Sequence, residues 1–241
     1  MRRTLAARAL AALALGACAL SLAARAAAAP TDPAANIPLG PLPRSCESAP
    51  HGSGCENAAI HALDAARAKL RLGGYLLPSN FVTLVPARQW LILSNLDRGS
   101  YGLRPVGGLA LALDAVAKQG AQSRSDPDPG PLLRSLQIEG VFGYSSNWAG
   151  GQPNALVAYY GWMYDDGPGG PNIDCPSPGA AGCWGHRHDI LAFAQGGVLT
   201  MGAAAISRAN SYALTIVDTS RPAWHYSYTW AQARRDGAGS G

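Results

Sequence analysis

The segment from Gly182 to Leu191 carries the side chains of this chain that are best suited to chemistry. It reads GCWGHRHDIL and places two imidazoles, a guanidinium and a carboxylate within four consecutive positions. An imidazole titrates near neutral pH, so His186 and His188 are candidates for acid–base catalysis or metal binding. The two histidines would share a face on a strand and diverge on a helix. The competing interpretation is structural, with His186 bonded to a backbone carbonyl or to Ser146 so that it fixes the loop.

Two kinds of site can be built around His186. A serine hydrolase would use Ser146 as nucleophile, His186 as base and Asp189 as orienting carboxylate, but no G-x-S-x-G elbow is present. A zinc site would use His186, His188 and Asp165, and zinc needs three or four ligands. These residues remain candidates: no catalytic residue is assigned, and no cofactor is predicted, with zinc as the alternative.

The acidic residues between the two tryptophan-containing stretches at 162 and 184 also invite a metal interpretation. Asp165, Asp166 and Asp174 lie in a loop rich in glycine and proline. Their spacing is not that of a helix–loop–helix calcium site. We therefore expect helix-end or turn residues, which aspartate favours.

Four of the five cysteines form two closely spaced pairs. Cys46 and Cys55 are nine residues apart, and Cys175 and Cys183 are eight residues apart. Each pair would close a short loop at small entropic cost, which predicts the disulfides Cys46–Cys55 and Cys175–Cys183. The alternative, zinc, lacks the usual two-residue spacing.

The first 28 residues are typical of an export signal. A basic start is followed by an Ala/Leu-rich run and then by small residues before Pro30. The run is too short and too rich in alanine for a convincing membrane span. We predict a secreted or periplasmic protein, and a lipoprotein attached through Cys18 is the less favoured alternative.

The apparent basicity of the chain belongs to this signal. The whole chain has 19 Lys and Arg against 15 Asp and Glu, but four arginines and no acid lie in residues 1–28. The remainder is balanced in charge. We therefore exclude nucleic acid as a partner and predict no transmembrane segment in the mature chain.

Hydrophobic periodicity gives the elements that must position these residues. Helices are expected at 57–70, 86–98, 109–119 and 154–163. In the C-terminal third, 197–206 and 212–217 are expected to form a hairpin, so helices followed by strands predict an α+β domain. The expected segments are a signal (1–28), an extended Pro-rich tether (29–54), an accessory helix and loop (55–84), the main domain (85–220), and an aromatic strand with a flexible tail (221–241).

The expected aromatic strand alternates large rings with polar residues. Trp224, Tyr226, Tyr228 and Trp230 would share one face. A buried face would cover the sheet, whereas an exposed face would stack on sugars, as in a carbohydrate-binding module.

The order of several short motifs resembles the CAP superfamily (cysteine-rich secretory proteins, antigen 5, pathogenesis-related 1) in its bacterial SCP-domain form. The similarity covers residues 86–218. Its carriers are Asn95-Leu96-Asp97-Arg98, Gly102-Leu103-Arg104-Pro105-Val106, Ser146-Asn147-Trp148-Ala149, Trp162-Met163 and Gly185-His186-Arg187-His188-Asp189-Ile190-Leu191.

The resemblance implies a CAP-like α-β-α sandwich with helices around a small antiparallel sheet. It also implies a binding cleft at Ser146, Asn147, Trp162, His186 and His188. Family members with a metal-binding cleft use two histidines and two acids; here His186 matches one histidine, and Gln119 or Gly120 and Ser146 stand at two other positions. We therefore expect a non-catalytic extracytoplasmic binding or scaffolding module, with a lipid, glycan or cell-wall ligand. A secreted hydrolase of cell-wall polymer or ester, with His186 as base, is the alternative.

Overall fold

The computed structural model describes residues 30–194 and 196–240, so the expected export signal and Cys18 lie outside the described residues. The strands, in chain order, are β1 (Tyr75–Leu76), β2 (Val106–Ala110), β3 (Val141–Gly150), β4 (Val198–Ile206), β5 (Ser211–Thr219), β6 (Tyr226–Thr229) and β7 (Gly239–Ser240). The helices are α1 (Ser45–Ser48), α2 (Ser53–Lys69), α3 (Pro86–Ser100), α4 (Leu111–Ser123), α5 (Gly130–Ser135), α6 (Ala155–Tyr164), α7 (Gly185–Leu191) and α8 (Trp230–Arg235), with 3-10 turns at Phe81–Thr83 and Ser207–Ala209.

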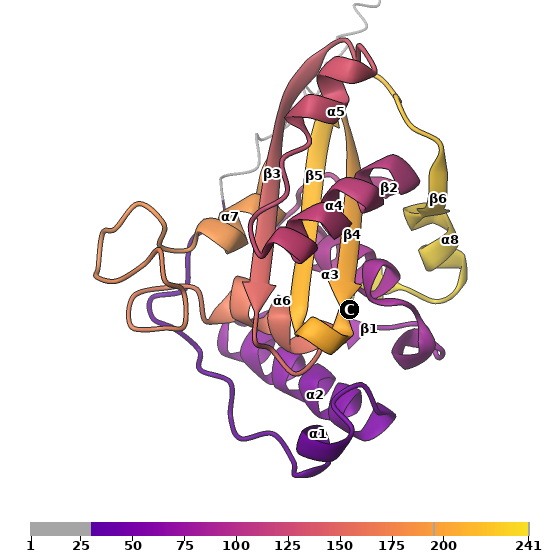
Figure 1. Ribbon diagram of the computed structural model, residues 1–241. Helices are drawn as coiled ribbons and strands as arrows, with labels where there is room; N and C mark the ends of the chain where they lie inside the picture. Colours follow the sequence, from indigo (N-terminus) through magenta and orange to yellow (C-terminus); the bar gives the residue numbers. More distant parts are fainter. Residues whose placement is uncertain (1–29, 195, 241) are drawn as a thin grey trace, which may run out of the picture.

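Five strands form one mixed sheet in the order β3-β5-β4-β2-β6 (Figure 1). The pairs β3–β5, β5–β4 and β2–β6 are antiparallel, whereas β2 runs parallel to β4. The expectation of a small, wholly antiparallel sheet is therefore wrong at β2. This strand was missed because its sequence, VGGLA, is too short and glycine-rich to show a period-two pattern.

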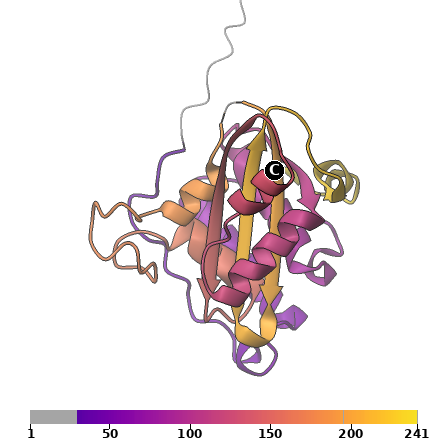
Figure 2. The same ribbon diagram turned by 45° about the horizontal axis from the view of Figure 1, so that its top comes forward.

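Helices cover both faces of this sheet. On one face α4 packs across β4 and β5, and α5 lies nearby (Figure 2). On the other face α3, α6 and α7 pack together and bury the larger of the two hydrophobic clusters. The close approach of α4 requires Gly202 on β4, because a Cβ there would lie 2.1 Å from the backbone of Leu113.

The predicted helices and hairpin match described elements within a few residues. Pro86 is the first residue of α3, and Asn154 caps α6 through its side chain, which accepts from the backbone N–H groups of Leu156 and Val157. Helix α2 begins earlier than expected, after Gly52, and the hairpin is β4–β5. Both predicted disulfides, Cys46–Cys55 and Cys175–Cys183, are present.

The Pro-rich segment after residue 29 is extended, but it is packed against the domain. Ile37 is buried, and its backbone N–H donates to the carbonyl of Tyr164. Asn36 binds the loop after α6. Residues 45–48 form α1 and α2 starts at Ser53, so the expected tether over 29–54 contains helix and makes tertiary contacts.

The C-terminal aromatic strand is shorter than expected. β6 ends at Thr229, and Trp230 opens α8 behind a capping box of Thr229 and Gln232. Tyr228 is buried in the larger cluster, and Trp224 packs on the smaller one. The four rings therefore share no single exposed face, and the expected flexible tail is replaced by α8 and by β7, which pairs with β1.

Within the described part of the chain, no helix combines the length and the apolar character that crossing a membrane requires.

Candidate functional site

A cleft of about 510 Å³ opens beside the end of the edge strand β3. Its walls come from five places in the sequence: the turn after α4, the end of β3, helix α6 with the loop that follows it, the start of α7, and the turn between β4 and β5. The charged and aromatic side chains that line it are Arg124, Asp126, Trp148, Trp162, Asp165, Asp166, Asp174 and His186. Of the expected cleft residues, only Trp162 and His186 line this cavity.

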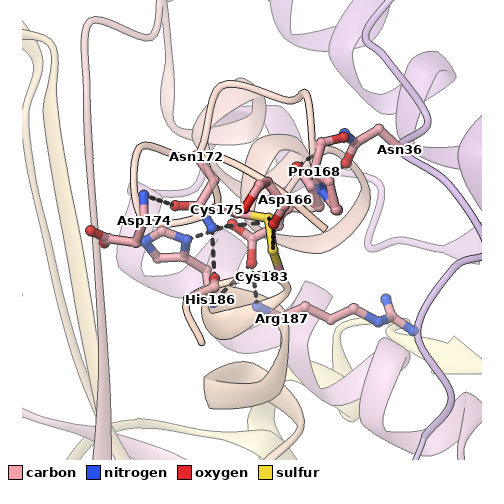
Figure 3. The surroundings of a disulfide bond; sticks show 12 residues. Asn36, Asp166, Pro168, Asn172, Asp174, Cys175, Cys183, His186 and Arg187 are labelled. Atoms are coloured by element: carbon pink, nitrogen blue, oxygen red, sulfur yellow. Dashed lines mark hydrogen bonds and ion pairs between the residues drawn. A yellow bond between two sulfur atoms is a disulfide. The ribbon is translucent and has the colours of Figure 1, made fainter. Parts of the chain in front are cut away.

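His186 is fixed by a carboxylate. Its Nδ1 lies 2.6 Å from Oδ1 of Asp166, and its backbone N–H donates to Oδ2 of the same carboxylate over 2.9 Å (Figure 3). The side chain of Asp166 is 2% exposed and that of His186 is 20% exposed. A carboxylate on Nδ1 orients an imidazole and leaves Nε2 for another partner, and no described residue hydrogen-bonds to Nε2.

Asp166 also explains why a helix can begin at this position. The residue before α7, Trp184, has a left-handed backbone (φ 61°) and no capping side chain. Asp166 supplies the missing acceptor from another segment, because its Oδ2 accepts from the first-turn N–H groups of His186 and Arg187. The carboxylate therefore stabilises the helix and the imidazole together.

His188 points elsewhere because α7 is a helix. Its Nε2 lies 2.8 Å from Oδ1 of Asp32, in the extended N-terminal segment, and its side chain is 55% exposed. The two imidazoles therefore do not converge. Among the described residues, no three His, Cys, Asp or Glu side chains are grouped to hold a metal ion, so His186, His188 and Asp165 do not fit the zinc site considered above.

The serine and asparagine of β3 lie on opposite faces of the sheet. Ser146 is paired in register with Thr215 and donates to its Oγ1 over 2.9 Å, on the face covered by α4. Asn147 points to the other face, where its amide donates to the backbone carbonyl of His186 over 2.8 Å. Ser146 is thus separated from His186 by the sheet, which removes it as the nucleophile of the candidate hydrolase.

Asp189 does not orient the His186 ring, because Asp166 occupies Nδ1. Burial raises the pKa of Asp189 to about 7, opposed by the charge of His186 and reinforced by that of Asp126. Burial also lowers the pKa of His186, but the hydrogen bond and charge of Asp166 outweigh it, so that pKa is raised above its usual 6.5. His186 thus lies among several acids, which favour its protonated form.

Two buried arginines hold α7 in place. Arg98 on α3 donates through Nη1 to the carbonyls of Ile190 (2.8 Å) and Ala192 (2.7 Å), which lie at the end of α7. Arg187 donates to the carbonyl of Met163 on α6 over 3.0 Å. Because the last carbonyls of a helix have no partner within the helix, Arg98 fixes the C-terminal end of α7, and Arg187 ties α7 to α6.

The loop between α6 and α7 lines one side of the cleft, and Figure 3 shows this loop with its disulfide. The disulfide Cys175–Cys183 folds this loop back on itself. Asn172 then ties it to the site, because its amide donates to the carbonyl of Asp166 over 3.1 Å and to that of Gly182 over 2.9 Å. From the other side, Asn36 donates to Pro168 over 2.7 Å and accepts from Gly167 over 2.7 Å.

Sequence reasoning missed several residues of this site. Asp166 was expected to be a turn residue, and Arg124, Asp126 and Trp148 were not considered as cleft residues. Arg124 and Asp126 lie 60 residues or more before His186, and no local pattern relates such distant positions. The one available signal was the proximity of Asp165 and Asp166 to the end of a predicted helix, where acids often meet another segment.

Comparison of the chain with protein-family models, with curated proteins and with solved structures gives no significant match.

Proposed function

We propose that this chain is an exported, CAP-like ligand-binding protein, and that its ligand occupies the cleft between β3, α6 and α7. The observation that carries the proposal is the His186 imidazole, which Asp166 fixes at the wall of a cavity of about 510 Å³. Cavities of this size with a few oriented polar groups are typical of small-molecule sites. The two disulfides are typical of proteins outside the cytoplasm.

The CAP resemblance supports this proposal through residue positions. Its Trp162-Met163 and Gly185-His186 motifs supply the α6 and α7 sides of one cleft. Binding is the function that these side chains support best, because Trp148 and Trp162 offer apolar surface beside the orienting polar group. Trp148 is half-buried in the cavity wall, and Trp162 is 2% exposed and lines the same cavity.

The test is a search with soluble fragments (sugars, amines, short fatty acids and aromatic acids) followed by NMR of the tryptophan indole groups. Fragments that bind should shift the indole signals of Trp148 and Trp162. Their affinity should fall about tenfold in His186→Ala and stay unchanged in His188→Ala, which alters a neighbouring histidine outside the cleft. Fragments that shift Trp224 and Trp230 instead would favour the carbohydrate-binding alternative and contradict the proposal.

A second function, hydrolysis, is favoured by one observation, the 2.6 Å contact of Asp166 with His186. A carboxylate–imidazole pair can act as a general base. Since Ser146 lies across the sheet, water would be the nucleophile. Nε2 takes its proton while its oxygen attacks the ester carbonyl, and the tetrahedral adduct then breaks its bond to the alcohol oxygen, which receives the proton from Nε2. Turnover of p-nitrophenyl acetate that disappears in His186→Ala, and persists in His188→Ala, would place this function ahead of binding.

A further inference from the structure

The charges that line the cleft are predominantly negative. Asp126 follows α4, Asp165 ends α6, and Asp174 belongs to the outer loop, whereas Arg124 is the fixed positive charge among the lining residues. The carboxylate of Asp166 is already engaged by His186. Three carboxylates therefore face one guanidinium within a single cavity.

We propose that the cleft selects an organic cation, a ligand whose ammonium group is attracted by the negative lining of Asp126, Asp165 and Asp174 and lies beside Trp148. The inference rests on the proposed function and names the ligand class of the same site. Two of the carboxylates are free to receive such a group, because the side chains of Asp165 and Asp174 make no hydrogen bond or ion pair with another described residue. Asp165 is half-buried, so an ammonium partner there would be shielded from water.

The aromatic wall fits the same ligand. The Nε1 of Trp148 donates to Oγ of Ser211 over 2.8 Å, and that of Trp162 donates to the carbonyl of Trp148 over 3.3 Å. Both indole N–H groups are therefore used inside the protein. The carbon atoms of the Trp148 ring remain for a ligand at the cavity wall, and an ammonium group is attracted to the face of such a ring when it lies within about 6 Å of it.

Two of these acids have raised pKa values, which a bound cation would lower. Burial raises the pKa of Asp165, and the charge of Asp166 raises it further. Burial likewise raises the pKa of Asp126, with His186 and the Trp148 backbone opposing and Asp174 reinforcing the shift. A bound cation would reduce both the desolvation and the mutual repulsion of these carboxylates.

The affinity of the cleft for a cation is expected to increase with pH. The titratable and charged groups that face the ligand position are Asp126 and Arg124 after α4, Asp165, Asp166 and Asp174 after α6, and His186 of α7 with Asp189 one turn further on. As the pH rises, Asp126 and Asp165, whose pKa values are raised, lose their protons, and His186 loses its positive charge. Both changes favour a cation, so affinity for it should increase between pH 5 and pH 8.

The experiment compares two pairs of probes of matched shape by calorimetric titration of the full chain at pH 7.5 and low salt. The first pair is choline and its neutral analogue 3,3-dimethylbutan-1-ol; the second is glucosamine and neutral glucose, which has a hydroxyl group in place of the ammonium. At least one cation should bind ten times more tightly than its neutral counterpart. If only choline binds more tightly than its neutral analogue, the site prefers a quaternary ammonium held by Trp148. If only glucosamine does so, the site prefers a primary ammonium held by the carboxylates.

Two variants locate the effect. Asp165→Asn should weaken the preferred cation about fivefold and leave its neutral analogue unchanged, whereas Asp236→Asn, on the exposed end of α8, should change neither. Trp148→Leu should weaken choline more than Trp148→Phe does, because only the phenyl ring keeps a π surface.

Two results would overturn the inference, and they are distinguishable. A neutral analogue that binds as tightly as its cation, while shifting the Trp148 and Trp162 indole signals, would refute the ligand class and leave the proposed binding function in place. If no probe of either charge and no fragment shifted those signals, the binding function itself would be refuted.

Discussion

Two buried aspartates organise polar networks in this protein, and they differ in whether the network closes on itself. Asp97 on α3 is fully buried and is contacted by Arg67 and by the hydroxyl groups of Tyr75, Tyr159 and Tyr164, two of them at 2.7 Å. Every one of these partners is a protein side chain. The network therefore joins α2, β1, α3 and α6 and offers nothing to a ligand.

Asp166 is almost as deeply buried, at 2% exposure, but its network is open at one end. Its carboxylate binds the backbone and Nδ1 of His186, while the imidazole reaches the cleft. The difference separates a network that contributes stability from one that prepares a side chain for an external partner. Burial of an ionised group alone therefore does not identify a site. A site is indicated when the last side chain of the network keeps a polar atom without a protein partner, as His186 does at Nε2 among the described residues.

The largest effect on stability is expected at Asp97, the centre of the closed network. Replacement by Ala should lower the free energy of unfolding by about 3–5 kcal/mol, because the buried charge of Arg67 would lose its counterion. Burial raises the pKa of Tyr75, Tyr159 and Tyr164, so without Asp97 these hydroxyls do not supply a replacement negative charge near neutral pH. Urea denaturation measures the loss.

The exposed Asp236 provides the control for that prediction. Asp236→Ala should change the free energy of unfolding by less than about 0.5 kcal/mol. Equal effects of the two variants would mean that the closed network does not stabilise the fold.

The two disulfides sharpen the comparison, since they close loops of similar length in different regions. Replacing either pair by alanines should cost about 2.5 kcal/mol through the added entropy of the unfolded chain. Only loss of Cys175–Cys183 should also disturb the site, because that loop carries Asn172 and Asp174. NMR titration of His186 in both variants tests this. A changed His186 pKa in the variant that lacks Cys46–Cys55 would contradict the prediction.

Asp166→Asn should have a smaller effect on stability, about 1.5 kcal/mol, because the His186 side chain keeps partial contact with water. The raised pKa of His186 should fall to below 6.5 once Asp166 no longer offsets burial. A histidine with a raised pKa stabilises the fold fully below its unfolded pKa and loses this contribution as the pH rises through the folded value. The stability lost in the variant should therefore be larger at pH 5.5 than at pH 8.5, and an equal loss at both would show that the pair is not ionic.

The smallest expected effect is at Asp189, whose pKa burial raises to about 7. A carboxyl group with a raised pKa favours the fold when protonated, so this contribution is lost as the pH rises through about 7. In Asp189→Asn the free energy of unfolding should fall less between pH 5 and pH 8 than in the unmodified chain, by roughly 1 kcal/mol after solvent screening. Thermal unfolding across this range, with Asp236→Asn as control, measures the slope; an unchanged slope would assign the pH dependence to other groups.

Local sequence determined the elements whose signals are short in range. The start of α3 at Pro86 and the capping of α6 by Asn154 follow from residues within one turn. The pairing of the four described cysteines followed from loop lengths of eight and nine residues. The hairpin of β4 and β5 followed from two apolar segments joined by a short turn.

Tertiary structure decided the site. Whether His186 and His188 converge depended on α7 being a helix, and that helix is stabilised by Asp166, 20 residues earlier, and by Arg98, more than 90 residues from the carbonyls it binds. Ser146 and Asn147 differ by one position, but the pleat of β3 sends them to opposite faces. The sequence by itself therefore specified helices, hairpin and disulfides through local chemistry, whereas the cleft was decided by packing between segments that no local pattern connects.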